Sequence, residues 1–87
     1  MEQMSQEAKP ITIIVNGQEK QWDQKEISFT QVVNLAFDGN PPTGPNVMFT
    51  VAYYRGHENK PQGTLVEGQS VRVKKDMRFD VTATNKS

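Results

Sequence analysis

The sequence predicts an α+β fold in which a mixed sheet of about four to five strands carries one helix packed across one face. Several segments are rich in β-branched residues or divide their side chains between two faces at every second position, which is typical of strands. A single segment instead spaces its apolar residues by three and four, which is typical of a helix. With 87 residues and 9.8 kDa, the chain forms one small domain and has no room for a second layer of helices.

The first two strands are expected to form a hairpin. Ile11–Val15 is rich in β-branched residues, which favour extended structure, and Asn16 and Gly17 follow directly. Asn-Gly is the strongest short signal for a hairpin turn, because both turn positions need a positive φ. A second, polar strand is therefore expected over residues 18–23, with Trp22 as its apolar anchor.

The helix is expected to begin after Ser28. Ser28 and Gln31 have the spacing of a capping box, in which each side chain accepts a hydrogen bond from the backbone N–H of the other residue. The apolar stripe that follows consists of Phe29, Val32, Val33, Ala36 and Phe37. Asp38 and Gly39 are expected to end the helix, because glycine suits a left-handed position after the last turn. A helix this short depends on packing against the sheet.

The second half of the chain is predicted to contain the remaining strands. Residues 40–46, with the sequence NPPTGPN, form a stiff crossover that excludes helix and central strand. Residues 47–55 and 77–83 alternate as strands, residues 64–66 resume apolar character, and residues 71–73 form a short strand or turn. The first and last strands are the most apolar, so we expect them side by side in the middle of the sheet.

Composition excludes several classes of site. Ten Lys and Arg balance ten Asp and Glu, which argues against a nucleic-acid partner. The absence of cysteine excludes disulfides, thiolate metal sites and a cysteine nucleophile. The longest apolar run is Ile13 to Val15, which is too short to cross a membrane, and residues 1–10 read as a polar, disordered N-terminal tail. We therefore expect a cytoplasmic protein with no membrane partner.

This order of elements describes the β-grasp architecture, and the chain resembles the bacterial multiubiquitin domain, a ubiquitin-like family. The segments that carry the resemblance are ITIIVNG at 11–17, ISF at 27–29, LAF at 35–37, NPPTGPN at 40–46, GTLVEG at 63–68 and MRFDVT at 77–82. The proline-rich segment is the most distinctive of them. The resemblance implies a ubiquitin-like domain over residues 11–84 and a C-terminal tail over residues 85–87.

The resemblance implies a protein modifier of a bacterial ubiquitination-like pathway. Such proteins are encoded beside a ThiF-type activating enzyme, a conjugating-enzyme-like protein and a processing or deconjugating peptidase, and some of these operons are linked to antiphage defence. The conjugation tail would be Thr84, Asn85, Lys86 and Ser87. It contains no Gly-Gly, the usual slender terminus of such modifiers, so either the enzymes accept a different terminus or a peptidase trims it. ATP and Mg²⁺ would be bound by the activating partner, and this chain would need no cofactor.

A partner-binding face is predicted on the sheet. If the odd-numbered positions of residues 47–55 face the core, then Met48, Thr50, Ala52 and Tyr54 face outward, and Ile14 joins them. Exposed apolar patches, and Met and aromatic residues in particular, are typical of interfaces. Ubiquitin-like folds use this same face for recognition. We therefore predict a partner-binding face made of Ile14, Met48, Ala52 and Tyr54.

No catalytic residue and no metal site are predicted on the chain. The one histidine, His57, is expected in an exposed loop, and no nucleophile or pocket accompanies it in the sequence. Two further functions stay open beside the modifier. One is a non-covalent interaction module in which the tail is inert. The other is a sulfur carrier that holds a C-terminal thiocarboxylate, although the missing Gly-Gly counts against it.

Overall fold

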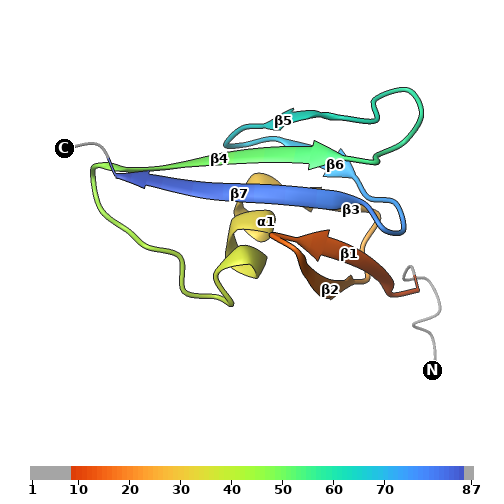
Figure 1. Ribbon diagram of the computed structural model, residues 1–87, viewed down its shortest axis with the longest axis horizontal. Helices are drawn as coiled ribbons and strands as arrows, with labels where there is room; N and C mark the ends of the chain where they lie inside the picture. The colour runs from red at the N-terminus through yellow and green to blue at the C-terminus, as the bar shows by residue number, and fades with distance from the viewer. Residues whose placement is uncertain (1–8, 86–87) are drawn as a thin grey trace.

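The computed structural model describes residues 9–85 and confirms the predicted β-grasp fold (Figure 1). The elements in chain order are β1 (Ile11–Val15), β2 (Gln18–Trp22), β3 (Glu26–Ser28), α1 (Phe29–Ala36), β4 (Val47–Tyr54), β5 (Gly63–Leu65), β6 (Ser70–Arg72) and β7 (Arg78–Asn85). Of the predicted N-terminal tail, residues 1–8 lie outside the described residues. Lys9 and Pro10 are exposed and precede β1.

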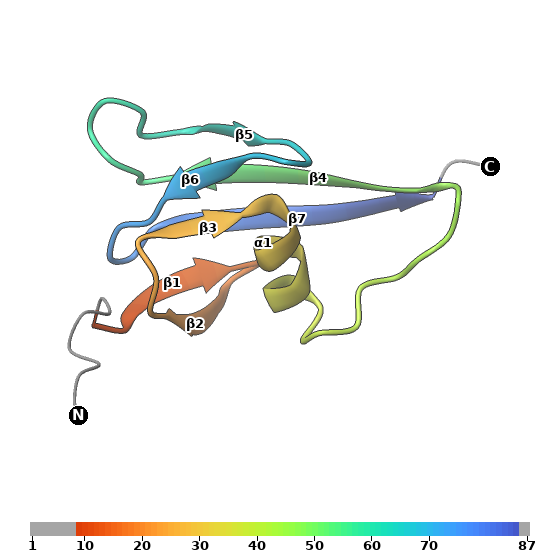
Figure 2. The ribbon, with the colours of Figure 1, turned by 180° about the vertical axis from the view of Figure 1, so that it is seen from behind.

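The main sheet has five strands in the order β2-β1-β7-β4-β5. β1 and β7 are parallel, whereas the other neighbouring strands are antiparallel. The first and last strands thus lie side by side in the middle of the sheet, as predicted. Helix α1 and the small sheet of β3 and β6 lie on one face of the main sheet, and the other face is left uncovered (Figures 1 and 2).

The predicted hairpin of β1 and β2 forms, with β2 ending at Trp22, one residue before the predicted end. Ile11 pairs with Trp22 at one end and Val15 pairs with Gln18 at the other. Asn16 and Gly17 adopt φ values of 52° and 81°, which are the positive values that a two-residue hairpin turn requires. The predicted turn is therefore confirmed.

Both ends of α1 follow the local signals in the sequence. The Ser28 side chain accepts a hydrogen bond from the Gln31 backbone at 3.1 Å, and the Gln31 side chain accepts one from the Ser28 backbone at 2.9 Å. The predicted capping box is thus confirmed. After the last turn, Asp38 and Gly39 both have positive φ, and the Gly39 N–H donates to the Asn34 carbonyl.

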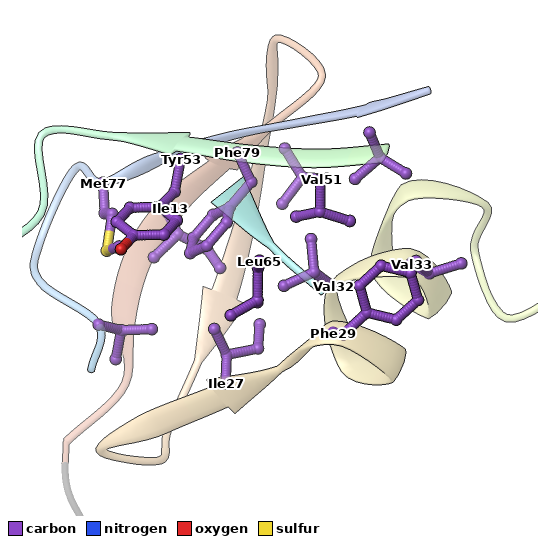
Figure 3. Close-up of a cluster of buried hydrophobic side chains, with 13 residues drawn as sticks. Ile13, Ile27, Phe29, Val32, Val33, Val51, Tyr53, Leu65, Met77 and Phe79 are labelled. Carbon is purple, nitrogen blue, oxygen red and sulfur yellow. The ribbon is translucent and has the colours of Figure 1, made fainter. Parts of the chain in front are cut away.

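The core lies between the main sheet and the layer that covers it (Figure 3). Its largest fully buried side chains are Phe79, Ile13, Ile27, Met77, Val15, Val32 and Val51. Phe79 occupies the centre, because β7 has a neighbour on each side and Phe79 pairs with Val15 and with Tyr53. The Tyr53 and Phe79 rings lie 6.5 Å apart between centroids. The three middle strands each contribute two buried side chains, and Phe79 is the largest of the fully buried ones.

The small sheet of β3 and β6 completes the covering layer and was only partly predicted. The predicted short strand or turn over residues 71–73 overlaps β6 at residues 71 and 72, whereas β3 was not predicted. Ile27 pairs with Val71, and it is the one residue of β3 that is buried. A three-residue strand with one apolar side chain has no periodic signal, so it is recognised only through its distant partner.

The Asn16 side chain extends the pairing of β1 with β7 beyond the end of β1. Its Nδ2 donates to the Val81 carbonyl at 3.2 Å, and its Oδ1 accepts from the Val81 N–H at 2.8 Å. The Asn16 amide therefore acts as one more rung of the ladder. The sequence predicted Asn16 as a turn residue only.

β7 is longer than predicted. The expected strand was 77–83, whereas Met77 precedes β7 and the strand continues to Asn85, one residue beyond the predicted domain boundary at 84. β4 and β7 pair along their whole lengths, from Tyr54 with Arg78 to Val47 with Asn85. Backbone pairing extends the strand past the last apolar position because it does not depend on the side chains.

Gly63 leaves space for the ring of Tyr53, its cross-strand partner. A Cβ atom at position 63 would meet the Tyr53 hydroxyl oxygen at 2.8 Å and its ring carbon Cζ at 3.1 Å. We expect Gly63→Ala to lower the free energy of unfolding by about 1–3 kcal/mol, because Tyr53 is buried and has to move. Urea denaturation measures the loss. In a Tyr53→Phe background the same change should cost less, and an equal cost would contradict the proposed clash.

Candidate functional site

The predicted orientation of β4 is confirmed: its odd-numbered side chains face the core, and its even-numbered side chains lie on the uncovered face of the sheet. Val51 and Tyr53 are buried on the core side, with relative exposures of 0% and 2%. Met48 and Tyr54 point the other way and are 50% and 40% exposed. Ala52 on β4 and Ile14 on β1 share that face and are half-buried.

The structure brings Ile14 and Tyr54 together around a charged residue. Arg78 of β7 pairs with Ile14 on one side and with Tyr54 on the other, so the three side chains form one row across three strands. In the next row Asp80 pairs with Ala52. The face is therefore mixed, with a basic and an acidic side chain between apolar neighbours. The prediction missed Arg78 and Asp80, although their alternation with Phe79 already put them outward.

Met48 does not belong to this group. It lies six residues from Tyr54 along β4, which is about 20 Å in an extended strand. It instead borders a groove of about 410 Å³ at the other end of β4, together with Phe49 and Val66. Val66 is 51% exposed and was not predicted as a surface residue. The four residues predicted as one face thus lie at two separate places on the sheet, with Met48 apart from the other three.

The predicted conjugation tail is partly contained in a strand. Thr84 and Asn85 are the last two residues of β7, where Thr84 pairs with Met48 and Asn85 pairs with Val47. Both side chains are exposed. Lys86 and Ser87 lie outside the described residues.

His57 is in a loop, as predicted, but the prediction that it is solvent-exposed is wrong. The ring is half-buried, and its Nε2 lies 3.0 Å from the Val73 carbonyl oxygen. Because a carbonyl oxygen can only accept, Nε2 carries the hydrogen. The Val73 N–H donates in turn to the Lys25 carbonyl at 3.0 Å. His57 thus ties the β4–β5 connection to two other loops.

The surface beside His57 is basic. Two shallow pockets of about 220 and 260 Å³ share His57 and Arg72, and Lys25 and Lys60 also line them. Within residues 9–85, no three His, Asp or Glu side chains lie close enough together to hold a metal ion. No helix in that part of the chain is long and apolar enough to cross a membrane.

One comparison with known proteins gives a match. The family model described as Multiubiquitin matches residues 11–85. The matched range begins at the first residue of β1 and ends at the last residue of β7, so it covers all strands and the helix. No curated protein and no solved structure matches the chain.

Proposed function

The chain belongs to the multiubiquitin family and is a ubiquitin-like domain, and from this premise we propose that it is a protein modifier of a bacterial ubiquitination-like pathway. Its partners in this proposal are a ThiF-type activating enzyme, a conjugating-enzyme-like protein and a processing or deconjugating peptidase. The chain itself is a substrate of these enzymes and catalyses nothing. The observation that carries the proposal is the family match over the whole of a β-grasp fold.

The proposed chemistry takes place at a C-terminal carboxylate. A carboxylate oxygen attacks the α-phosphorus of ATP, pyrophosphate leaves, and an acyl-adenylate forms. A nucleophile of the carrier enzyme then attacks the acyl carbon, its proton is lost and AMP leaves. An amine of the target next attacks the same carbon, the bond to the carrier breaks, and the nitrogen loses a proton as the amide forms. ATP and Mg²⁺ are bound by the activating enzyme, so the chain supplies the carboxylate and the surfaces by which it is recognised.

The row of Ile14, Arg78 and Tyr54 is the recognition surface in this proposal. It combines an aliphatic side chain, an arginine and a tyrosine on a rigid sheet, and arginine and tyrosine are residue types enriched at interface hot spots. Ala52 and Asp80 extend it by one row. The groove beside Met48 is a second candidate surface, closer to the end of β7.

We expect covalent products in cells that carry the native operon. N-terminally tagged protein, recovered under denaturing conditions, should give a ladder of heavier species on a gel. Intact mass and peptide mapping should identify a shortened form or a branched peptide and so locate the reactive terminus. Cells with an inactivated activating enzyme are the control and should show the free form alone. A single species of unaltered mass, with the operon partners expressed and active, would overturn the modifier.

The non-covalent interaction module is the second candidate, and the exposed row around Arg78 favours it. The discriminating conditions are inactivation of the activating enzyme and the substitution Tyr54→Ser, because a truncation after Asn85 would reproduce the trimmed form that the modifier also allows. Loss of function without the activating enzyme supports the modifier. Full function without the activating enzyme, with loss in Tyr54→Ser, supports the module. A C-terminal mass gain equal to the replacement of oxygen by sulfur would indicate a sulfur carrier.

A role in antiphage defence is part of the same proposal. Plaque counts on cells with the operon, with and without this gene, test it. Fewer plaques in the presence of the gene are the expected result.

A further inference from the structure

The last four rungs of the β4–β7 pair stand apart from the rest of the sheet. β5 pairs with β4 from Val51 to Tyr53, and β1 pairs with β7 at Arg78 and Phe79. Residues 47–50 and 82–85 are therefore paired with each other and with no third strand of the described chain. The two strands extend side by side beyond the other elements toward the C-terminal end of the domain (Figures 1 and 2).

These four rungs form a two-stranded ribbon made of residues 47–50 of β4 and residues 82–85 of β7, and its two strands are anchored very differently. On the β4 side, Phe49 packs against the core, and its ring centroid lies 5.9 Å from that of Phe37. Val47 is also half-buried. On the β7 side, all four residues from Thr82 to Asn85 are exposed, and none of them belongs to the core. The β7 half is held by its pairing with β4, whereas the β4 half is also held by the core.

Val81 marks the point at which this difference begins. It is buried, with a relative exposure of 7%, and it pairs with Val51 on one side. On its other side the Asn16 amide binds both its N–H and its carbonyl. Residues 82–85 have β4 alone as a partner. They can therefore detach from β4 without exposing the core, and the detachment stops at Val81.

We propose that residues 82–85 form a strap that is released from β4 before the C-terminal carboxylate is activated. This inference rests on the proposed modifier function and adds a conformational step to it. An adenylating enzyme has to accept the C-terminal segment as a single extended chain, whereas a paired ribbon is wider by the spacing between two strands, about 4.8 Å. The strap has the sequence TATN, whose side chains are small or polar. Once it is no longer paired with β4, such a segment suits a narrow channel. Pairing with β4 therefore competes with activation.

A disulfide across the ribbon tests the strap directly. The chain contains no cysteine, so the double variant Met48→Cys/Thr84→Cys has one possible intramolecular disulfide. Residues 48 and 84 are directly opposite, and such antiparallel pairs have Cα separations of about 4.5–5.5 Å, within the range of a disulfide. The readout is pyrophosphate exchange into ATP by the activating enzyme, which reports adenylation and includes no thiol step.

We expect exchange with the oxidised double variant to fall far below exchange with the same protein after reduction, and this comparison within one protein cancels any effect of the two substitutions themselves. The matched control is Thr12→Cys/Gln21→Cys, which places a cross-strand disulfide in the β1–β2 hairpin and leaves β7 untouched. This control should be active in both states. Full exchange by the oxidised Met48→Cys/Thr84→Cys variant would overturn the strap, and so would an equal loss in the oxidised hairpin control. No exchange with the unmodified chain would instead overturn the proposed function on which the strap rests.

Hydrogen exchange tests the same step without any enzyme. The backbone amides of residues 82–85 should exchange faster than those of residues 78–81, because local detachment exposes the first group alone. Oxidation of the Met48→Cys/Thr84→Cys pair should slow exchange in the strap. Equal protection of the two groups in the unmodified chain would overturn the proposal.

Discussion

Phe79→Ala is expected to remove a large part of the stability of the domain. Phe79 is fully buried in the central strand, and truncating a buried phenylalanine costs about 3–5 kcal/mol through lost burial and the cavity left behind. Domains are stabilised by about 0.05–0.15 kcal/mol per residue, which for 87 residues is about 4–13 kcal/mol. The variant should therefore unfold at much lower urea concentration.

Urea denaturation followed by fluorescence measures this loss. The chain has one tryptophan, Trp22, which is half-buried against the core and reports on folding. Thr30→Ala, at an exposed position of α1, is the matched control and should stay within about 0.5 kcal/mol of the unmodified chain. A loss below about 1 kcal/mol for Phe79→Ala would contradict the central position of Phe79 in the core.

The second large effect is expected at Asn16. Asn16→Ala removes both hydrogen bonds to Val81, each with a net value of about 0.5–1.5 kcal/mol, and places alanine at a positive φ, which costs about 1 kcal/mol more. We therefore expect a total loss of about 2–4 kcal/mol in the free energy of unfolding. Such a loss is unusual for an exposed turn residue.

Glycine at the same position separates the two contributions. Asn16→Gly also removes the hydrogen bonds but adopts a positive φ without strain, so it should be less destabilised than Asn16→Ala by about 1 kcal/mol. Urea denaturation of the three proteins gives both differences. If Asn16→Gly were as stable as the unmodified chain, the bonds between the Asn16 amide and Val81 would contribute nothing.

Local patterns explain what could be predicted from the sequence. The Asn16-Gly17 turn, the Ser28–Gln31 capping box and the alternation along β4 each depend on residues that are close in the chain, and the structure confirms all three. The middle position of β1 and β7 was predicted because these strands are the most apolar. In the middle of the sheet these strands lie opposite the covering layer, and their inward side chains are buried.

Interactions between distant segments explain what was missed. β3 exists because Ile27 pairs with Val71, far along the chain. His57 is half-buried beside Val73, whose carbonyl oxygen lies 3.0 Å from the His57 Nε2. The row of candidate residues around Arg78 also depends on pairing between distant segments. Arg78 joins Ile14 to Tyr54 only through the order of three strands, whereas Met48 shares the alternation of Tyr54 but lies far from it.

The central place of β7 also determines when the domain can fold. β7 is the last strand of the chain, yet it separates β1 from β4 in the sheet. Asn16 and Val81, which lock this junction, are 65 positions apart. The β1–β2 hairpin and α1 involve neighbouring residues and can form early, but the centre of the sheet requires closure of a long loop. The centre of the sheet can therefore form only after residues 78–85 have been synthesised.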